Sequence, residues 1–566
     1  MRMANKSTAE KLATIQKGYT LEGATIELGA AIVDGEVHKE AQVRLPLSMM
    51  NRHGLVAGAT GTGKTVTLHM MAEQLSTAGV PVFLADIKGD LSGLATGATA
   101  SEKLLARTES LGQQWEGKAF PVEFLSLGGD GNGVPVRATI TSFGPILLSR
   151  IMELNDTQES SLQLIFHFAD KKKLELVDLK DLRAVIQFLT SDGGKSELED
   201  LGGLSKATAG VILRELVNLE AQGMEKFFGE PEFDTAELLR TAPDGRGVIS
   251  CLELPTLQTK PMLFSTFLMW LLADLFEDLP EAGDLDKPKL VFFLDEAHLL
   301  FNGASKAFLD AITTTVRLIR SKSVGISFVT QTPKDVPSDV LGQLANRVQH
   351  ALRAFTPEDA RALKATVSTF PVSDYDLGET LTSAGIGEAV ITVMNEQGAP
   401  TPVALTKLRA PESLMGPSAE DLVRSTIAGS KLLTKYGTAV DNISAYEKLS
   451  MKAAPAPATG DAVPGSPPAP AASGQDAVDA EARRIEEEIL GRPSSRPAPS
   501  SAGFPSTPAP VPVPRQQDGS AMMGDLAGVL EGALGGGIKS MARSFGSQLG
   551  RELLRGVFGT SSRRRR

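Results

Sequence analysis

The residues from Gly58 to Thr65 carry the most specific chemical pattern in this sequence. They read GATGTGKT, which satisfies G-x-x-x-x-G-K-[ST], and they lie between a short apolar run and a helical pattern. Glycines let a backbone fold around phosphate, and the N–H groups of such a loop point the positive ends of their dipoles inward. We predict that Lys64 reaches the β- and γ-phosphates of a nucleotide and that the Thr65 hydroxyl binds Mg²⁺. The predicted cradle consists of Gly58, Ala59, Thr60, Gly61, Thr62, Gly63, Lys64 and Thr65. The alternative is an ordinary glycine-rich turn before a helix.

A second pattern is an apolar run that ends in two acids, LVFFLDEAHLL, at residues 290–300. A buried strand has little reason to end in two carboxylates unless a cation lies there. Asp295 is the predicted acid on the Mg²⁺ side, and Glu296 is predicted to polarise the water that attacks a γ-phosphate. The alternative reading makes the two acids the N-cap and first turn of the next helix.

Further candidates surround a third apolar run, GISFVTQTP, at residues 325–333. Gln331 is predicted to sense the γ-phosphate or to orient water, with a turn residue before Pro333 as the alternative. Just upstream, Arg317 and Arg320 are candidates to neutralise transition-state charge, either in their own subunit or in a neighbouring one. The alternative for both arginines is a solvated charge on an amphipathic helix.

Charged residues also follow the run that ends at Asp86, in ADIKGDLSGL. Asp86, Lys88 and Asp90 are expected at the same sheet edge as the phosphate loop. There they either support the metal shell or cap the following segment. Arg347 and Arg353 are lesser candidates for an arginine that acts on phosphate.

These residues require a parallel sheet to bring them together, because ligands bind at the carboxyl ends of parallel strands. Short Val- and Leu-rich runs alternate with helical patterns from Gly54, which is typical of a buried parallel sheet with crossover helices. The predicted core strands are 55–57, 80–86, 290–295 and 325–331. Further strands are expected at 347–355, 389–394 and 403–408, the last two joined by a hairpin at Gln397 and Gly398.

The fold class expected is α/β, with a mainly parallel sheet, a large and mostly helical insertion and a disordered C-terminal linker. Inside the insertion, strands are expected at 122–127, 136–140 and 247–254, and helical periodicity runs over 146–188 and 208–228. The predicted divisions are a short strand region at 1–45, a core at 46–98 and 287–417, the insertion at 99–286, a helical extension at 418–452, a Pro/Ala/Ser-rich linker at 453–536 and a basic amphipathic helix with an arginine tail at 537–566.

Bulk composition limits the class of function. The formal net charge is -11 and aromatic residues make up 5%, so the chain as a whole does not resemble a basic protein that coats nucleic acid. The single cysteine, Cys251, excludes an intramolecular disulfide and favours a reducing compartment, for which the cytoplasm is the default. The longest apolar stretch, 262–276, is too short and too polar to span a bilayer and is expected to be a buried helix.

Five segments together resemble the bacterial DUF853 family, HerA-helicase-like P-loop ATPases related to the FtsK translocases. They are RHGLVAGATGTGKT, FLADIKGDLSGL, LVFFLDEAHLLF, SVGISFVTQTPKDVP and NRVQHALRAFTPEDA. The resemblance covers most of residues 44–417, and RSFGSQLGRELLRGVFG near the C-terminus is also similar. It implies a RecA-like core of the ASCE class that uses ATP and Mg²⁺ through Lys64, Thr65, Asp295, Glu296 and Gln331. It also implies ring assembly, commonly hexameric. The short N-terminal part departs from the barrel domain of HerA itself.

Two functions follow from this reading. The first is an ATP-driven motor acting on DNA, which rests chiefly on the resemblance. The second is an ATP-dependent protein remodeller or scaffold, in which the C-terminal helix docks a partner protein. The same helix, with its arginines and apolar stripe, also suits an anionic membrane surface or DNA, and the alternative is a helix that is solvated or packs within an oligomer.

Overall fold

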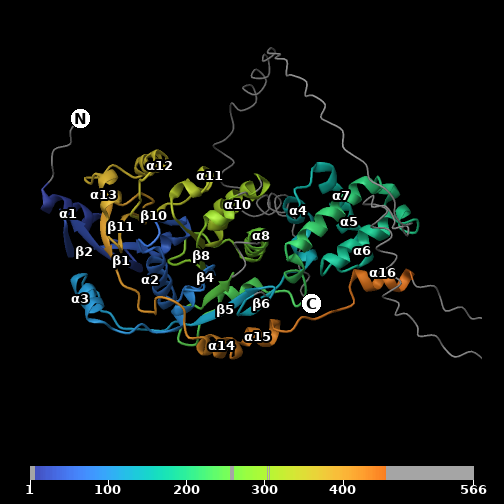
Figure 1. Ribbon diagram of the computed structural model, residues 1–566, viewed down its shortest axis with the longest axis horizontal. Coiled ribbons are helices and arrows are strands. Elements are labelled where there is room, and N and C mark those ends of the chain that lie inside the picture. The colour runs from blue at the N-terminus through green and yellow to red at the C-terminus, as the bar shows by residue number, and fades with distance from the viewer. Residues whose placement is uncertain (1–6, 130, 255–260, 303, 305, 454–566) are drawn as a thin grey trace, which may run out of the picture.

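The computed structural model describes residues 7–453, apart from 130, 255–260, 303 and 305. The linker and the basic terminal helix that the sequence predicts after residue 453 lie outside the described residues. The described part is elongated. A small group of strands lies at one end, a large sheet in the middle and a cluster of helices at the other end (Figure 1).

The described residues form one mixed sheet with the order β2-β1-β12-β11-β10-β3-β9-β8-β4-β7-β5-β6. The strands are β1 Thr25–Val33, β2 Glu36–Pro46, β3 Gly54–Ala57, β4 Val82–Asp86, β5 Val122–Leu127, β6 Val134–Val136, β7 Ile249–Glu253, β8 Leu290–Leu294, β9 Val324–Thr330, β10 Asn346–His350, β11 Glu388–Thr392 and β12 Ala404–Leu408. From β10 to β6 all neighbours are parallel, whereas β11, β12, β1 and β2 are added antiparallel. The α/β fold class with a mainly parallel sheet is therefore confirmed.

Each core strand alternates its side chains between two apolar layers. On β4, Phe83 and Ala85 belong to the core that also contains α8 and α10. Val82 and Leu84 belong to the core that contains α2 and α1. A strand buried on both faces explains why the sequence of β4 is continuously apolar rather than alternating. The parallel part of the sheet is thus the middle of three layers.

The helices that surround the sheet begin mostly at Ser, Thr, Asn or Asp N-caps. They are α1 Thr8–Gly18, α2 Lys64–Thr77, α3 Glu102–Ser110, α4 Ile140–Ile151, α5 Asp156–Lys172, α6 Leu179–Thr190, α7 Lys206–Ala221, α8 Pro261–Asp278, α9 His298–Phe301, α10 Lys306–Ile319, α11 Ser338–Leu341, α12 Pro357–Ser368, α13 Leu377–Ser383, α14 Glu420–Ala428, α15 Lys431–Tyr436 and α16 Ala445–Ala453. None of the helices in the described part of the chain is long and apolar enough to cross a membrane.

The range 99–286 contributes both strands and helices. Its strands β5, β6 and β7 pair in parallel and extend the core sheet beyond β4. The strand expected at 136–140 ends at Val136 instead, because the Thr139 hydroxyl accepts a hydrogen bond from Ser142 N and caps α4. The helical run expected over 146–188 is divided into α4, α5 and α6, since Asn155 and Asp178 begin new helices with capping boxes.

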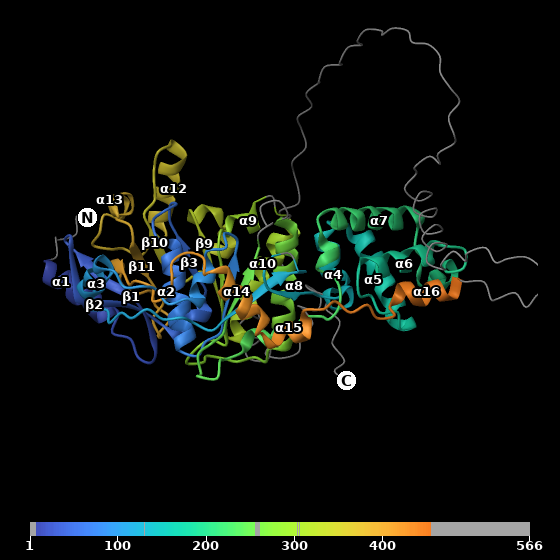
Figure 2. The same cartoon turned by 60° about the horizontal axis from the view of Figure 1, so that its bottom comes forward.

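Helices α4 to α7 cluster at the end of the molecule farthest from β1 and β2 (Figure 2). Helix α16, from the end of the described chain, packs beside α6 in this cluster. The contact is anchored by Asp181, whose Oδ1 accepts hydrogen bonds from Ser444 Oγ at 2.5 Å and from Tyr446 N at 2.8 Å. The segment after the core therefore returns to cover the helical part.

At the other end, strands β1 and β2 form the antiparallel group expected near the N-terminus. They join the main sheet through β12, with Gly29 opposite Leu408. A Cβ on Gly29 would lie 2.1 Å from Lys407 O, so the close pairing requires glycine there. The hairpin expected at Gln397 and Gly398 does connect the antiparallel strands β11 and β12.

Candidate active site

The predicted phosphate loop lies at the carboxyl end of β3, between β10 and β9. Gly61 and Gly63 have φ values of +77° and +113°, a region that side chains other than glycine rarely adopt. Helix α2 begins directly afterwards at Lys64, so the N–H groups of its first turn face the loop. The structure therefore has the strand, loop and helix that the motif requires.

Lys64 folds back over this loop. Its Nζ donates hydrogen bonds to Gly58 O at 2.7 Å and to Ala59 O at 3.3 Å. Burial lowers the pKa of the Lys64 ammonium, while the charges of Glu296 and Asp295 act in the opposite direction. The lysine is thus held in the loop and within the electrostatic reach of both predicted acids.

His350, the last residue of β10, supports the loop from behind. It is fully buried, and its Nε2 lies 2.9 Å from Thr67 Oγ1 on α2. Burial and, to a smaller extent, the charge of Lys64 lower the pKa of His350 to about 4, so the ring is neutral near pH 7. A Cβ on Gly58 would lie 2.4 Å from His350 Cβ. The fit between Gly58 and His350 therefore fixes the start of the loop.

We expect Gly58→Ala to weaken ATP binding by about tenfold or more, because the added methyl group must push the loop away from His350. Gly193→Ala is the matched control, since the nearest atom to its Cβ is Ser191 Oγ at 4.0 Å. Titration calorimetry with a non-hydrolysable ATP analogue measures the effect. Equal affinity in the Gly58 variant and the control would contradict this account of the loop.

The predicted acid pair follows β8, two strands from β3 in the sheet order. Asp295 is only 6% exposed, and its Oδ1 accepts a hydrogen bond from Glu296 N at 2.9 Å. Burial raises the pKa of Asp295 to about 6. Within the described residues Asp295 forms no ion pair with a lysine or arginine. A buried carboxylate without a direct cationic partner fits the role of a metal ligand.

The predicted ligands, Asp295 and Thr65, suit Mg²⁺ better than a metal that needs all of its ligands from the protein. The candidate ligands are oxygen atoms of Asp295 and Thr65, and Mg²⁺ prefers oxygen and commonly takes its remaining ligands from phosphates and water. In the part of the chain that the structure describes, no cluster of three or more His, Cys, Asp or Glu side chains could hold a metal. The residues present therefore fit a metal that arrives with a nucleotide.

Glu296 lies beside Asp295 with an unusual backbone, φ +45°. Its Oε1 lies 2.5 Å from Lys88 Nζ in an ion pair, and its Oε2 lies 3.3 Å from His298 Nδ1. Burial opposes the charge of Glu296, but the hydrogen bond and charge of Lys88 outweigh burial and lower the pKa of this carboxyl group. Glu296 is thus an ionised carboxylate at the sheet edge that carries the phosphate loop.

Gln331 is the first residue after β9, the strand between β3 and β8. In the pairing of β3 with β9, Ala57 is opposite Thr330, and Gly58 N donates to Thr330 O at 3.2 Å. Gln331 therefore follows at the level of the phosphate loop, and it is exposed. Its contact with a γ-phosphate or with water stays a prediction.

The structure does not bring Arg317 and Arg320 to this site. Both are exposed near the end of α10, just before β9 begins. The preceding residue, Val316, accepts a hydrogen bond at 2.6 Å from Nε2 of His53, which comes directly before β3. The two arginines therefore lie at the amino edge of the sheet, opposite the phosphate loop of their own chain.

Two side chains that position the site, His350 and Arg107 on α3, were not singled out from the sequence. Lys88 was expected at this sheet edge, but not as the ion-pair partner of Glu296. Arg107 Nη2 donates to Gly387 O at 3.0 Å, and Gly387 N donates to Thr62 O at 3.0 Å. Arg107 thereby braces the phosphate loop through the segment before β11. No local sequence pattern predicts such contacts, because the residues in contact are far apart in the sequence.

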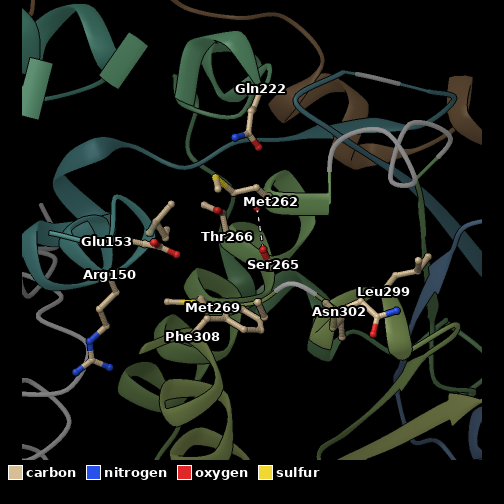
Figure 3. A pocket seen from close by; sticks show the side chains of 13 residues that line it. Arg150, Glu153, Gln222, Met262, Ser265, Thr266, Met269, Leu299, Asn302 and Phe308 are labelled. Atoms are coloured by element: carbon tan, nitrogen blue, oxygen red, sulfur yellow. Dashed lines mark hydrogen bonds between the residues drawn. The ribbon is translucent and has the colours of Figure 1, made fainter. Parts of the chain in front are cut away.

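A separate cavity of about 170 Å³ lies among helices on the face of the sheet that α8 and α10 cover. Figure 3 shows side chains from α8 and α10 around it, together with residues near the ends of α4 and α9. Leu299, Leu300 and Asn302, which closely follow the acid pair, line one side. No residue of the phosphate loop is among its lining residues, so this cavity is distinct from the nucleotide site.

The chain is similar to a curated protein and to several solved structures. The DNA double-strand break repair helicase HerA of Saccharolobus solfataricus is 22% identical over 398 residues, which are 69% of each protein. Among solved structures, the plasmid coupling protein TrwB in complex with ADP and Mg²⁺ has a TM-score of 0.46 and 15% identity, and the match covers 69% of this chain and 96% of TrwB. VirB4 of Thermoanaerobacter pseudethanolicus has a TM-score of 0.42 and 14% identity, over 69% of this chain and 97% of VirB4.

The family description that matches this sequence covers nearly all of it. The family is described as helicase HerA-like C-terminal, and the match spans residues 32–566. It includes the phosphate loop, the acid pair and Gln331. The chain therefore belongs to the helicase HerA-like C-terminal family.

Proposed function

We propose that this chain is a Mg²⁺-dependent ATPase and that its hydrolysis of ATP drives a motor acting on DNA. The observation that carries the ATPase part is that a complete phosphate loop and an ionised Glu296 meet at one edge of the sheet. Membership of the HerA-like family supports the motor part. The relative from Saccharolobus solfataricus is a DNA double-strand break repair helicase, which favours DNA as the polymer.

In this proposal each residue has a separate task. Lys64 and the N–H groups of the loop bind the β- and γ-phosphates, and Thr65 and Asp295 hold Mg²⁺. The metal supplies positive charge that stabilises the phosphate oxygens in the transition state. Glu296 accepts the proton of a water whose oxygen attacks the γ-phosphorus while the bond to the β-phosphate oxygen breaks. Gln331 orients that water.

The proposal includes a ring of identical chains, with six as the expected number. Transition-state charge at a phosphate commonly needs an arginine, and Arg317 and Arg320 lie at the edge opposite their own loop. A neighbouring chain that presents this edge to the loop would supply one of them. The ring therefore explains why two exposed arginines are far from the nucleotide site of their own chain. A reducing compartment, the cytoplasm, suits the single buried cysteine.

The test is the ATPase rate of the full chain with and without double-stranded DNA across a salt series. We expect DNA to raise the rate at low salt and the stimulation to fade as salt rises, because phosphate contacts release counterions. A variant with serine in place of Arg563 to Arg566 tests whether the basic tail contributes to this effect. An ATPase that DNA leaves unchanged at low salt would favour the alternative, a protein remodeller or scaffold whose C-terminal helix docks a partner.

A further inference from the structure

Lys88 and Glu296 form an ion pair across two neighbouring strand ends. Lys88 follows β4 and Glu296 follows β8, and the two strands are adjacent and parallel (Figure 1). The Lys88 side chain is 48% exposed and that of Glu296 only 10%, with 2.5 Å between Nζ and Oε1. The pair therefore differs from an ordinary surface ion pair, since one partner is largely removed from water.

The backbone around Lys88 is held by hydrogen bonds, whereas its long side chain is half exposed. Asp86 Oδ1 accepts hydrogen bonds from Lys88 N at 3.2 Å and Gly89 N at 2.7 Å, and its Oδ2 accepts one from Leu91 N at 3.0 Å. Buried Asp86 thus fixes the turn that carries the lysine. A long flexible side chain on a fixed backbone can exchange one partner for another without moving the fold.

The Lys88 side chain is not enclosed by its neighbours. Lys88 lines a cavity of about 530 Å³ at the ends of β4 and β7, bounded on the far side by residues at and before α14, among them Ser418 and Arg424. Asp86 and Glu253 line the same cavity. The half-exposed Lys88 side chain therefore has open space on the side of β7 and α14. On the other side, burial lowers the pKa of Lys64 in the phosphate loop, and the charge of Lys88 is close enough to lower it further.

Charge decides which partner Lys88 prefers when a nucleotide is bound. In the proposed function the γ-phosphate lies where Glu296 activates water, so both anions are within reach of the same lysine. A γ-phosphate carries more negative charge than one carboxylate and presents several acceptor oxygens, and it therefore competes well for a half-exposed ammonium group. ADP has no γ-phosphate and offers no such competitor.

We propose that Lys88 is a positioning residue that pairs with Glu296 in the nucleotide-free chain and transfers to the γ-phosphate when ATP binds, which releases Glu296 to water. The inference rests on the proposed function of the site. It links recognition of the γ-phosphate to the freeing of the residue that activates water. An ATPase so built keeps its base engaged until the correct nucleotide has bound.

The test compares affinities of the full chain for ADP and for a non-hydrolysable ATP analogue, both with Mg²⁺. Lys88→Met keeps the length of the side chain and removes its charge. We expect it to lose about tenfold in affinity for the ATP analogue while its affinity for ADP stays within about twofold of wild type. Lys88→Arg, which keeps the charge, is expected to restore most of the preference. Lys334→Met, at an exposed lysine of the same sheet edge, is the control.

The possible results separate this inference from the proposed function. If Lys88→Met lowers the affinity for ADP and for the ATP analogue equally, the lysine has a purely structural role. If both affinities are unchanged, Lys88 is only a solvated charge. Either result overturns the inference while the site remains a nucleotide site. The proposed function itself fails if wild type does not bind the nucleotides, or if it binds them equally well when Lys64 is replaced.

Discussion

Glu296→Gln is expected to abolish turnover of ATP while nucleotide binding remains. Glutamine has nearly the same shape as glutamate but cannot accept the proton of the attacking water, and loss of a positioned base typically costs about 10²- to 10⁴-fold in rate. Binding survives because the proposed contacts to the phosphates come from the loop and from Lys64, which donates to Gly58 O and not to Glu296. Phosphate release and calorimetric binding, measured on the same preparation, give the two quantities.

The control for this variant is Glu420→Gln, the same exchange at an exposed acid on α14. Its rate is expected to equal that of wild type. A Glu296→Gln protein that hydrolyses ATP at the wild-type rate would remove this glutamate from the mechanism. Loss of both binding and turnover would instead indicate that Glu296 is needed for the shape of the site.

Lys64→Ala is expected to reduce ATP and ADP binding by about a hundredfold or more. Hydrogen bonds between charged groups contribute about 1.5 to 3 kcal/mol each, and one ammonium group on two phosphates makes at least two of them. In the nucleotide-free chain Lys64 only donates to two carbonyl groups of its own loop, so its removal should change the melting temperature little. Calorimetry and thermal unfolding measure the two effects separately.

Lys103→Ala, at an exposed lysine on α3, is the matched control and is expected to bind nucleotide as wild type does. The melting temperature of wild type should rise on addition of MgATP, and that of Lys64→Ala should not, because a ligand stabilises only a chain that binds it. Nucleotide affinity in the lysine variant within about threefold of wild type would contradict the assignment of the loop.

The candidate site residues could be predicted from the sequence because each one lies in the segment that follows the carboxyl end of a core strand. The parallel sheet places the carboxyl ends of β3, β8 and β9 at one edge, and this alone brings Lys64, Glu296 and Gln331 together. The order of these strands was not needed for that prediction. A strand-end motif survives errors of one or two residues in the predicted boundaries.

Contacts between distant segments could not be predicted in the same way. The Lys88 and Glu296 pair joins residues 208 positions apart, and the contact of His350 with Thr67 joins residues 283 positions apart. No periodicity or spacing encodes such distances. The antiparallel extension of the sheet by β1 and β2 is a similar case, since the predicted strand group could not show that it would pair with β12.

Some local structure was missed although a signal was present. Helix α1 begins after Ser7, whose hydroxyl accepts a hydrogen bond from Glu10 N while the Glu10 carboxylate accepts one from Ser7 N. The sequence STAE at this position is the pattern of such a capping box. The strand expected to reach Phe355 ends at His350, and Phe355 itself is 86% exposed. The next two residues, Thr356 and Pro357, are an N-cap and a proline at the first helical position, a pattern that predicts the start of α12.

The most direct measurement is the time course of phosphate release from ATP by the purified full chain, with Mg²⁺ and then after chelation by EDTA. We predict many turnovers per chain with Mg²⁺, loss of release after chelation, and no more than trace release from Glu296→Gln under either condition. Release that continues at the same rate without Mg²⁺ and in the Glu296→Gln chain would contradict the site described here.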